Sequence, residues 1–99
     1  MGAEEQLHAY GWELKYAVRA LKKKYPDDEE VTNVVAHGGR MVEGIDRTSP
    51  IDIIGGRNQL LRSLERVKKK HPNDETVENV EAAANKVITA LAELSQKKK

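Results

Sequence analysis

A chain of 99 residues with no cysteine, 38% hydrophobic positions and 33% charged positions has the composition of one small globular domain. The absence of cysteine excludes disulfides, thiolate zinc sites, iron–sulfur clusters and cysteine nucleophiles. No apolar run approaches the roughly 18–20 residues of a membrane span, and residues 1–5 lack the basic and then apolar pattern of a signal peptide. We therefore expect a cytoplasmic protein that does not enter a membrane.

The charges of the chain nearly cancel. Seventeen Lys and Arg residues against 16 Asp and Glu residues leave a formal net charge of +1. This balance creates no net field that would attract nucleic acid or an anionic membrane surface. We expect a monomer whose partner is a small molecule.

An internal repeat divides the chain into two halves. Residues 22–36 and residues 68–82 match at ten of fifteen positions when they are offset by 46, which indicates two copies of one unit. Each copy has the pattern of a helix, a tight turn and a second helix. We predict hairpin repeats at about residues 3–45 and 50–96, within a single domain of residues 1–99.

Apolar residues recur every three or four positions in four stretches, the spacing of amphipathic helices. In chain order these residues are Leu7, Tyr10, Leu14, Val18 and Leu21; Val31, Val34, Val35, Met41, Val42 and Ile45; Ile53, Leu60, Leu64 and Val67; and Val77, Val80, Ala84, Val87, Ile88, Leu91 and Leu94. Short connections make consecutive helices antiparallel neighbours. The sequence therefore predicts an all-α fold, an antiparallel up-down-up-down four-helix bundle made of two repeated helical hairpins.

Start and stop signals flank these stretches. Asp27 with Glu30 has the spacing of a capping box, and Ser49 is followed by a proline suited to the first helical position. Three runs of lysine, at residues 22–24, 68–70 and 97–99, fall where helices are expected to end. Cations interact favourably with the dipole there, so we interpret these runs as solvated helix ends.

The whole chain resembles computationally designed helical bundles. The features that carry the resemblance are the near-ideal repeats, the Pro-Asp-Asp and Pro-Asn-Asp turns, the faces rich in Lys and Glu, and a core without Cys or Phe. The resemblance has no functional motif attached. It implies that departures from an ideal bundle serve a function.

The main departures are glycines. Six of the seven glycines lie within or at the edges of the predicted helices: Gly11, Gly38, Gly39, Gly44, Gly55 and Gly56. Each glycine in a helix interior costs about 1 kcal/mol relative to alanine. All six lie at one level, toward the end of the bundle that carries the loop of residues 46–49. We therefore predict a pocket between the helices at this level, with close helix packing at the glycines as the alternative.

One histidine borders the predicted pocket. His37 lies at the edge of the apolar stripe of the second helix, whereas His8 is expected to be partly buried and His71 exposed. His8 and His37 differ in height by about seven residues, or about 10 Å, too far apart for one metal ion. A single imidazole suffices for haem b, because the porphyrin supplies four nitrogens.

The first functional hypothesis is therefore a haem-binding protein with His37 as axial ligand and catalytic residue. Its iron would keep one open face for peroxidase-type or carbene-transfer chemistry, the activities of the designed haem bundles that the chain resembles. Arg57 and Arg40 are the candidate partners of the propionates. The other residues expected around the cofactor are Gly38, Met41, Tyr10, Gly11, Gly56 and Ala84.

Three alternatives remain open. The same cavity would suit a metal-free small molecule, contacted by Tyr10, Trp12 and Arg57. His37 would alternatively serve an enzyme as a general base or nucleophile. A bundle without any ligand is the third alternative. Trp12 and Tyr16 share a face that we interpret as amphipathic surface, with a helix seam or a dimer contact as the alternatives.

Overall fold

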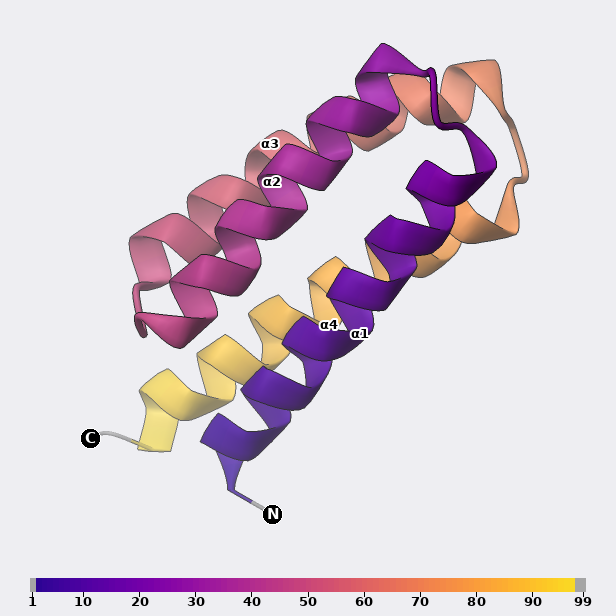
Figure 1. Ribbon diagram of the computed structural model, residues 1–99. Helices are drawn as coiled ribbons and strands as arrows, with labels where there is room; N and C mark the ends of the chain where they lie inside the picture. The colour runs from indigo at the N-terminus through magenta and orange to yellow at the C-terminus, as the bar shows by residue number, and fades with distance from the viewer. Residues whose placement is uncertain (1, 98–99) are drawn as a thin grey trace.

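The computed structural model describes residues 2–97 and contains four helices. They are α1 (Ala3–Lys24), α2 (Glu29–Asp46), α3 (Pro50–Lys70) and α4 (Glu75–Lys97). The helices form the predicted antiparallel bundle, and no strand occurs in residues 2–97. Both proline turns lie at one end of the bundle, whereas the turn between α2 and α3 lies at the other end, together with the chain termini (Figure 1).

The four helices do not pack equally closely. α2 lies against α3, and α1 lies against α4, as two tight antiparallel pairs (Figure 1). The contact between α1 and α2 is less extensive, and the contact between α3 and α4 is the least extensive of the four. The bundle is elongated, with principal extents of 43 × 22 × 18 Å.

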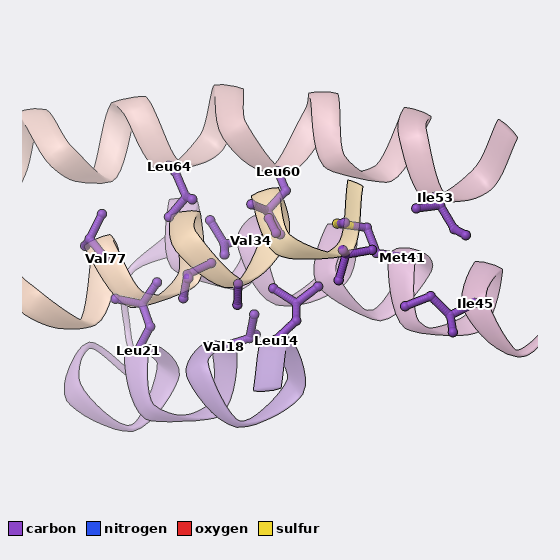
Figure 2. Close-up of a cluster of buried hydrophobic side chains, with 14 of the residues drawn as sticks. Leu14, Val18, Leu21, Val34, Met41, Ile45, Ile53, Leu60, Leu64 and Val77 are labelled. Carbon is purple, nitrogen blue, oxygen red and sulfur yellow. The ribbon is translucent and has the colours of Figure 1, made fainter. Parts of the chain in front are cut away.

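The predicted apolar stripes form one continuous core. Its labelled side chains run along the bundle from Val77 and Leu21 near the proline turns to Ile53 and Ile45 near the opposite end (Figure 2). Leu14, Leu60 and Met41 are fully buried between them. Burial of apolar surface is the dominant force that stabilises such a bundle, and it explains why stripe spacing predicted the fold.

The helix ends follow the predicted chemistry, with one correction. α2 begins one residue later than the capping box suggested, because the side chain of Asp28, not of Asp27, accepts hydrogen bonds from the backbone N–H groups of Glu30 and Val31. Ser49 caps α3, as predicted, and Pro50 occupies the first helical turn. Lysines 22–24 and 68–70 lie in the last turns of α1 and α3. Lys98 and Lys99 lie outside the described residues.

The turn between α2 and α3 contains an unusual backbone conformation. α2 continues past Gly44 and ends at Asp46. The chain then turns through Thr48, whose φ of 54° lies in the left-handed region. The backbone N–H of Ser49 donates a hydrogen bond of 2.8 Å to the carbonyl oxygen of Gly44. A β-branched residue with positive φ is strained, so this turn stores conformational energy beside the glycine level.

Candidate ligand-binding cleft between α1 and α2

The buried glycines are points where neighbouring helices touch. A Cβ atom added at Gly56 of α3 would lie 2.9 Å from Cγ of Met41 and 3.3 Å from the backbone oxygen of His37, both in α2. A Cβ atom at Gly11 would lie 2.9 Å from Cδ1 of Ile45. These distances are shorter than van der Waals contact, so the glycines permit an approach that alanine would hinder.

The pocket predicted in the interior is therefore filled at these positions, and the alternative of close packing describes them correctly. Met41 and Ile45 have the flexible side chains that occupy the space left by Gly56 and Gly11. Ala84, another residue expected around the pocket, is fully buried in the core. Sequence spacing placed the glycines at one level correctly, but it carried no information on which long side chains would fill that level.

Open space at the glycine level lies on the outside of the bundle, along the seam of α1 and α2. A cleft of about 220 Å³ lies over Val18, Val35, Gly38, Gly39 and Val42, with Lys15 and Arg19 on its α1 side. The apolar floor of this cleft comes from both helices. All of its charged lining residues come from α1.

A second and smaller cleft adjoins the first. It measures about 100 Å³ and shares Lys15 and Val42 with the larger cleft. Its remaining lining residues are His8, Gly11, Trp12, Ile45 and Asp46. We call the two together the α1–α2 cleft. Because the two clefts share these two lining residues, they form one groove along the seam of α1 and α2.

Gly39 differs from the other glycines of the cleft. A Cβ atom added at Gly39 would meet nothing within 4 Å, whereas one at Gly38 would lie 3.1 Å from Cγ2 of Val18. Gly39 is exposed and lies in the interior of α2. Helix packing therefore accounts for Gly38 but does not account for Gly39, although glycine costs about 1 kcal/mol there relative to alanine.

Two cations stand at the rim of the larger cleft. Lys15 and Arg19 are four residues apart in α1 and therefore share a face. Among the described residues, neither forms an ion pair with a carboxylate. The ammonium of Lys15 instead lies 4.8 Å from the centre of the Trp12 ring. The only acid of the α1–α2 cleft is Asp46, at its far end, 3.9 Å from Nδ1 of His8.

Trp12 and Tyr16 form an exposed aromatic pair beside the cleft. Their side chains are 56% and 62% exposed, and their ring centres are 6.2 Å apart. This confirms the interpretation of a surface face. Trp12 lines the smaller part of the α1–α2 cleft, whereas Tyr16 lines a separate and more open cleft of about 290 Å³ against α4, beside Glu13 and Lys86.

The residues predicted around haem are distributed over different helix contacts. His37, Met41 and Gly56 meet between α2 and α3. Tyr10 is half-buried and faces Lys86 of α4, whose Nζ lies 5.9 Å from the centre of its ring. Gly11 and Gly38 line the α1–α2 cleft, to which His37 does not contribute.

The two candidate propionate partners also have different surroundings. Arg40 already has an anionic partner, because its guanidinium lies 3.5 Å from Oδ1 of Asp52 and 3.1 Å from the position of a Cβ atom on Gly55. Arg57 is half-buried, and its Nε is buried without a hydrogen-bond partner. The imidazole of His37 is likewise half-buried and forms no hydrogen bond or ion pair among the described residues.

The other two histidines differ from the expectation. His8 is exposed, not partly buried, because it lines the smaller cleft beside the exposed Asp46. His71 is half-buried, not exposed: its ring stacks on Tyr25 at a centre distance of 3.9 Å, and its Nε2 lies 3.6 Å from Asp28. The repeat offset of 46 relates position 25 to position 71 and position 28 to position 74. This relation was the signal in the sequence that the two proline turns meet.

Asp74, in the second proline turn, has a carboxylate that is strongly stabilised in its ionised form. Asp74 is nearly buried and accepts hydrogen bonds from the hydroxyl and backbone N–H of Thr76 and from the hydroxyl of Tyr25, with Lys24 Nζ 3.0 Å away. The Thr76 hydroxyl and then the Tyr25 hydroxyl hold the pKa of Asp74 well below its usual range, although burial opposes them. The hydrogen bond to Asp74 in turn raises the pKa of Tyr25.

Within residues 2–97, no three His, Asp or Glu side chains are grouped closely enough to hold a metal ion. No helix in this part of the chain is both long and apolar enough to cross a membrane. The chain matches no known protein family model, no curated protein and no solved structure. The assignment of function therefore depends on the geometry of the site alone.

The structure brings out cleft residues that the sequence interpretation did not assign to a site. These are Lys15, Val18, Arg19, Val35 and Val42. Gly39 was counted at the level of the predicted pocket but not among the residues expected around the cofactor. A signal was available in part, because Val35 and Val42 extend the apolar stripe of α2 beyond what the core needs. Gly39 lies off the core stripe, and its repeat counterpart is the polar Asn85.

Proposed function

We propose that the protein binds a small molecule with an apolar ring system, without a metal ion, in the α1–α2 cleft. The observation that carries the proposal is Gly39. Its missing side chain leaves open space over an apolar floor, and no neighbouring atom of the protein requires a glycine there. A residue that weakens its helix and relieves no contact is explained by a ligand that uses the space.

The volume and lining of the cleft fit a ligand of modest size. Half-buried Val35 and Val42 form the α2 wall, and Val18 lies beneath Gly38. Ligand sites are commonly lined by apolar side chains with a few polar groups for orientation, in pockets of about 300–1,000 Å³. A cleft of about 220 Å³ is smaller, so the ligand is of the size of one or two fused aromatic rings.

Calorimetric titration with 2-naphthamide, a neutral bicyclic probe, tests this function. The variant Gly39→Leu places a side chain in the open space and should abolish binding. Ala36→Leu is the matched control, because residue 36 is exposed on the same helix and does not line the cleft. Binding that is equal in both variants would contradict the proposal. An unmodified protein that binds neither 2-naphthamide nor its carboxylate analogue 2-naphthoate would also contradict it.

Haem binding at His37 is a second candidate function. It is favoured by two half-buried basic side chains without partners, the imidazole of His37 and the guanidinium of Arg57, whose Nε is buried. The packing around them does not fit a porphyrin, because Met41 and the backbone of His37 lie directly against Gly56. Haem would require the contact between α2 and α3 to open, so we derive no catalytic step through it.

An absorbance titration with hemin tests this second candidate. Saturable one-to-one binding with a sharpened Soret band, lost in His37→Ala and retained in Gly39→Leu, would support haem at His37. A Soret band that is identical in His37→Ala would exclude His37 as the ligand. Peroxidase-type or carbene-transfer activity would be assayed only after such binding, since both need an iron with one open face.

A further inference from the structure

We infer that the ligand of the α1–α2 cleft is an aromatic carboxylate. This inference rests on the proposed function and adds the chemical class of the ligand. The rings would lie over Gly38 and Gly39, and the carboxylate would lie at the rim, between the ammonium of Lys15 and the guanidinium of Arg19. The arrangement of charge around the cleft carries the inference.

The larger cleft is lined by two cations and no anion. Its lining residues from α2 are all uncharged, and α1 contributes Lys15 and Arg19 beside Val18. Like charges four residues apart on a helix repel each other. Six Lys and Arg side chains in the described part of the chain pair with carboxylates, for example Lys68 with Glu81, whereas Lys15 and Arg19 do not. A carboxylate at the rim would relieve the repulsion between these two cations.

The chemistry of the two side chains suits one carboxylate. A guanidinium binds a carboxylate through two parallel hydrogen bonds, and an ammonium adds a point charge. Lys15 is half-buried and Arg19 is exposed, and both lie beside the apolar floor of the cleft. A ligand whose rings cover that floor would exclude water from the rim, and charge-assisted hydrogen bonds would then be stronger than in bulk water. The carboxylate therefore orients the ligand, and the apolar rings supply the buried surface.

Trp12 explains why the apolar part should be aromatic. Its ring is exposed and lines the smaller part of the α1–α2 cleft, next to the shared residue Lys15. The ammonium of Lys15 lies 4.8 Å from the centre of this ring, a contact that favours its position beside the cleft. A flat ligand that extends from Gly39 along the seam meets the edge of Trp12, and aromatic rings prefer such edge or offset contacts.

The experiment compares three probes that share one ring system. They are 2-naphthoate, which is an anion at pH 7, the neutral 2-naphthamide, and the cationic 2-naphthylmethylamine. We expect 2-naphthoate to bind at least tenfold more tightly than 2-naphthamide, and the amine to bind most weakly. The preference for the anion should shrink as salt is raised, because exposed charges are screened.

Two variants locate the charge recognition. In the double variant Lys15→Gln with Arg19→Gln, naphthoate and naphthamide should bind equally. The matched control is Lys23→Gln with Lys69→Gln, which removes the same charge from exposed residues that do not line the cleft. The control should keep the full preference for naphthoate.

The outcomes separate this inference from the proposed function. If naphthamide and naphthoate bind the unmodified protein equally and Gly39→Leu abolishes both, the function stands and the carboxylate inference fails. If neither probe binds, both fail. Sedimentation supplies one more contrary outcome: a dimer that dissociates in Gly39→Leu would assign the cleft to a second copy of the chain and overturn the inference.

Discussion

Gly56 of α3 faces Met41 of α2 so closely that a Cβ atom on the glycine would lie 2.9 Å from Cγ of the methionine. Met41 is fully buried, so its side chain occupies the space that glycine leaves free. Two kinds of glycine therefore occur at one level of the bundle. Gly56 permits a helix contact, whereas Gly39 faces open space.

Alanine substitution should change the free energy of unfolding in opposite directions at these two kinds of glycine. Gly56→Ala should lower the free energy of unfolding by about 1–3 kcal/mol, because the added methyl group overpacks the contact with Met41. Gly39→Ala should raise it by about 0.5–1 kcal/mol, because alanine favours the helix and the methyl group meets no atom. Urea denaturation of both variants measures the difference, and two changes of the same sign would contradict this distinction.

Met41→Ala tests the same contact from the other side. Truncation of a fully buried methionine leaves a cavity, and we expect a loss of about 2–5 kcal/mol. The double variant Met41→Ala with Gly56→Ala should lose less stability than the sum of the two single losses, because the smaller side chain makes room for the added methyl group. A double-mutant cycle by urea denaturation gives the coupling. Strict additivity would mean that the two residues do not contact each other.

The close packing at Gly56 shows where prediction from the sequence reached its limit. Stripe spacing and the repeat predicted the four helices and their antiparallel order, because both depend on which residues avoid water. The role of each glycine depends on the residue that faces it from another helix, such as Met41 or Ile45. No local pattern encodes that partner, so an interior pocket and close packing looked alike in the sequence.

The open cleft was harder to predict for a related reason. It lies along the less extensive contact between α1 and α2, where Val35 and Val42 are half-buried. The spacing between two helices is set by side chains along their whole contact, and not by the residues that line the cleft. Lys15 and Arg19 are ordinary surface residues in the sequence, and only the structure places both beside Gly39.

Asp74 should make the stability of the protein depend on pH in the acidic range. Its pKa is lowered in the folded protein, first by the Thr76 hydroxyl and then by the Tyr25 hydroxyl. A carboxylate with a lowered pKa stabilises the fold above its unfolded pKa of about 4, and this stabilisation is lost as the pH falls. The free energy of unfolding should therefore decline from about pH 5 downward.

The variant Asp74→Asn isolates this contribution. Asparagine caps a helix about as well as aspartate, so the substitution removes the charge and leaves the cap. We expect a loss of about 1–3 kcal/mol at pH 7 and a weaker dependence on pH below 5. Thermal unfolding followed by circular dichroism from pH 2 to pH 7 measures both effects. An unchanged slope in Asp74→Asn would assign the acid sensitivity to other carboxylates.

The stacked rings of Tyr25 and His71 should couple the two proline turns. Their centres are 3.9 Å apart, and aromatic pairs contribute about 0.5–1.5 kcal/mol beyond their buried area. A double-mutant cycle with Tyr25→Leu and His71→Leu should give a coupling of this size. Ring stacking predicts a coupling that survives 1 M salt, whereas an effect of the His71 pair with Asp28 would be screened.

Thr48 offers a stabilising substitution. Its φ of 54° is unfavourable for a β-branched residue, and the side chain is exposed. Thr48→Gly should therefore raise the free energy of unfolding by about 1 kcal/mol. Thr48→Val is the control that keeps the branching and should give no gain. Differential scanning calorimetry measures the stability of both variants. A lower stability of Thr48→Gly than of the unmodified protein would contradict the assigned strain.

The most direct test of the proposed site is a two-dimensional ¹H–¹⁵N spectrum of the labelled protein during titration with 2-naphthoate. Glycine amides resonate in a separate region, so the seven glycines serve as reporters at known places. We predict that Gly38 and Gly39 shift most, together with Lys15 and Val42, and that Gly56 remains unchanged. Shifts concentrated at Gly56 and His37, or no shifts at all, would contradict the α1–α2 cleft as the binding site.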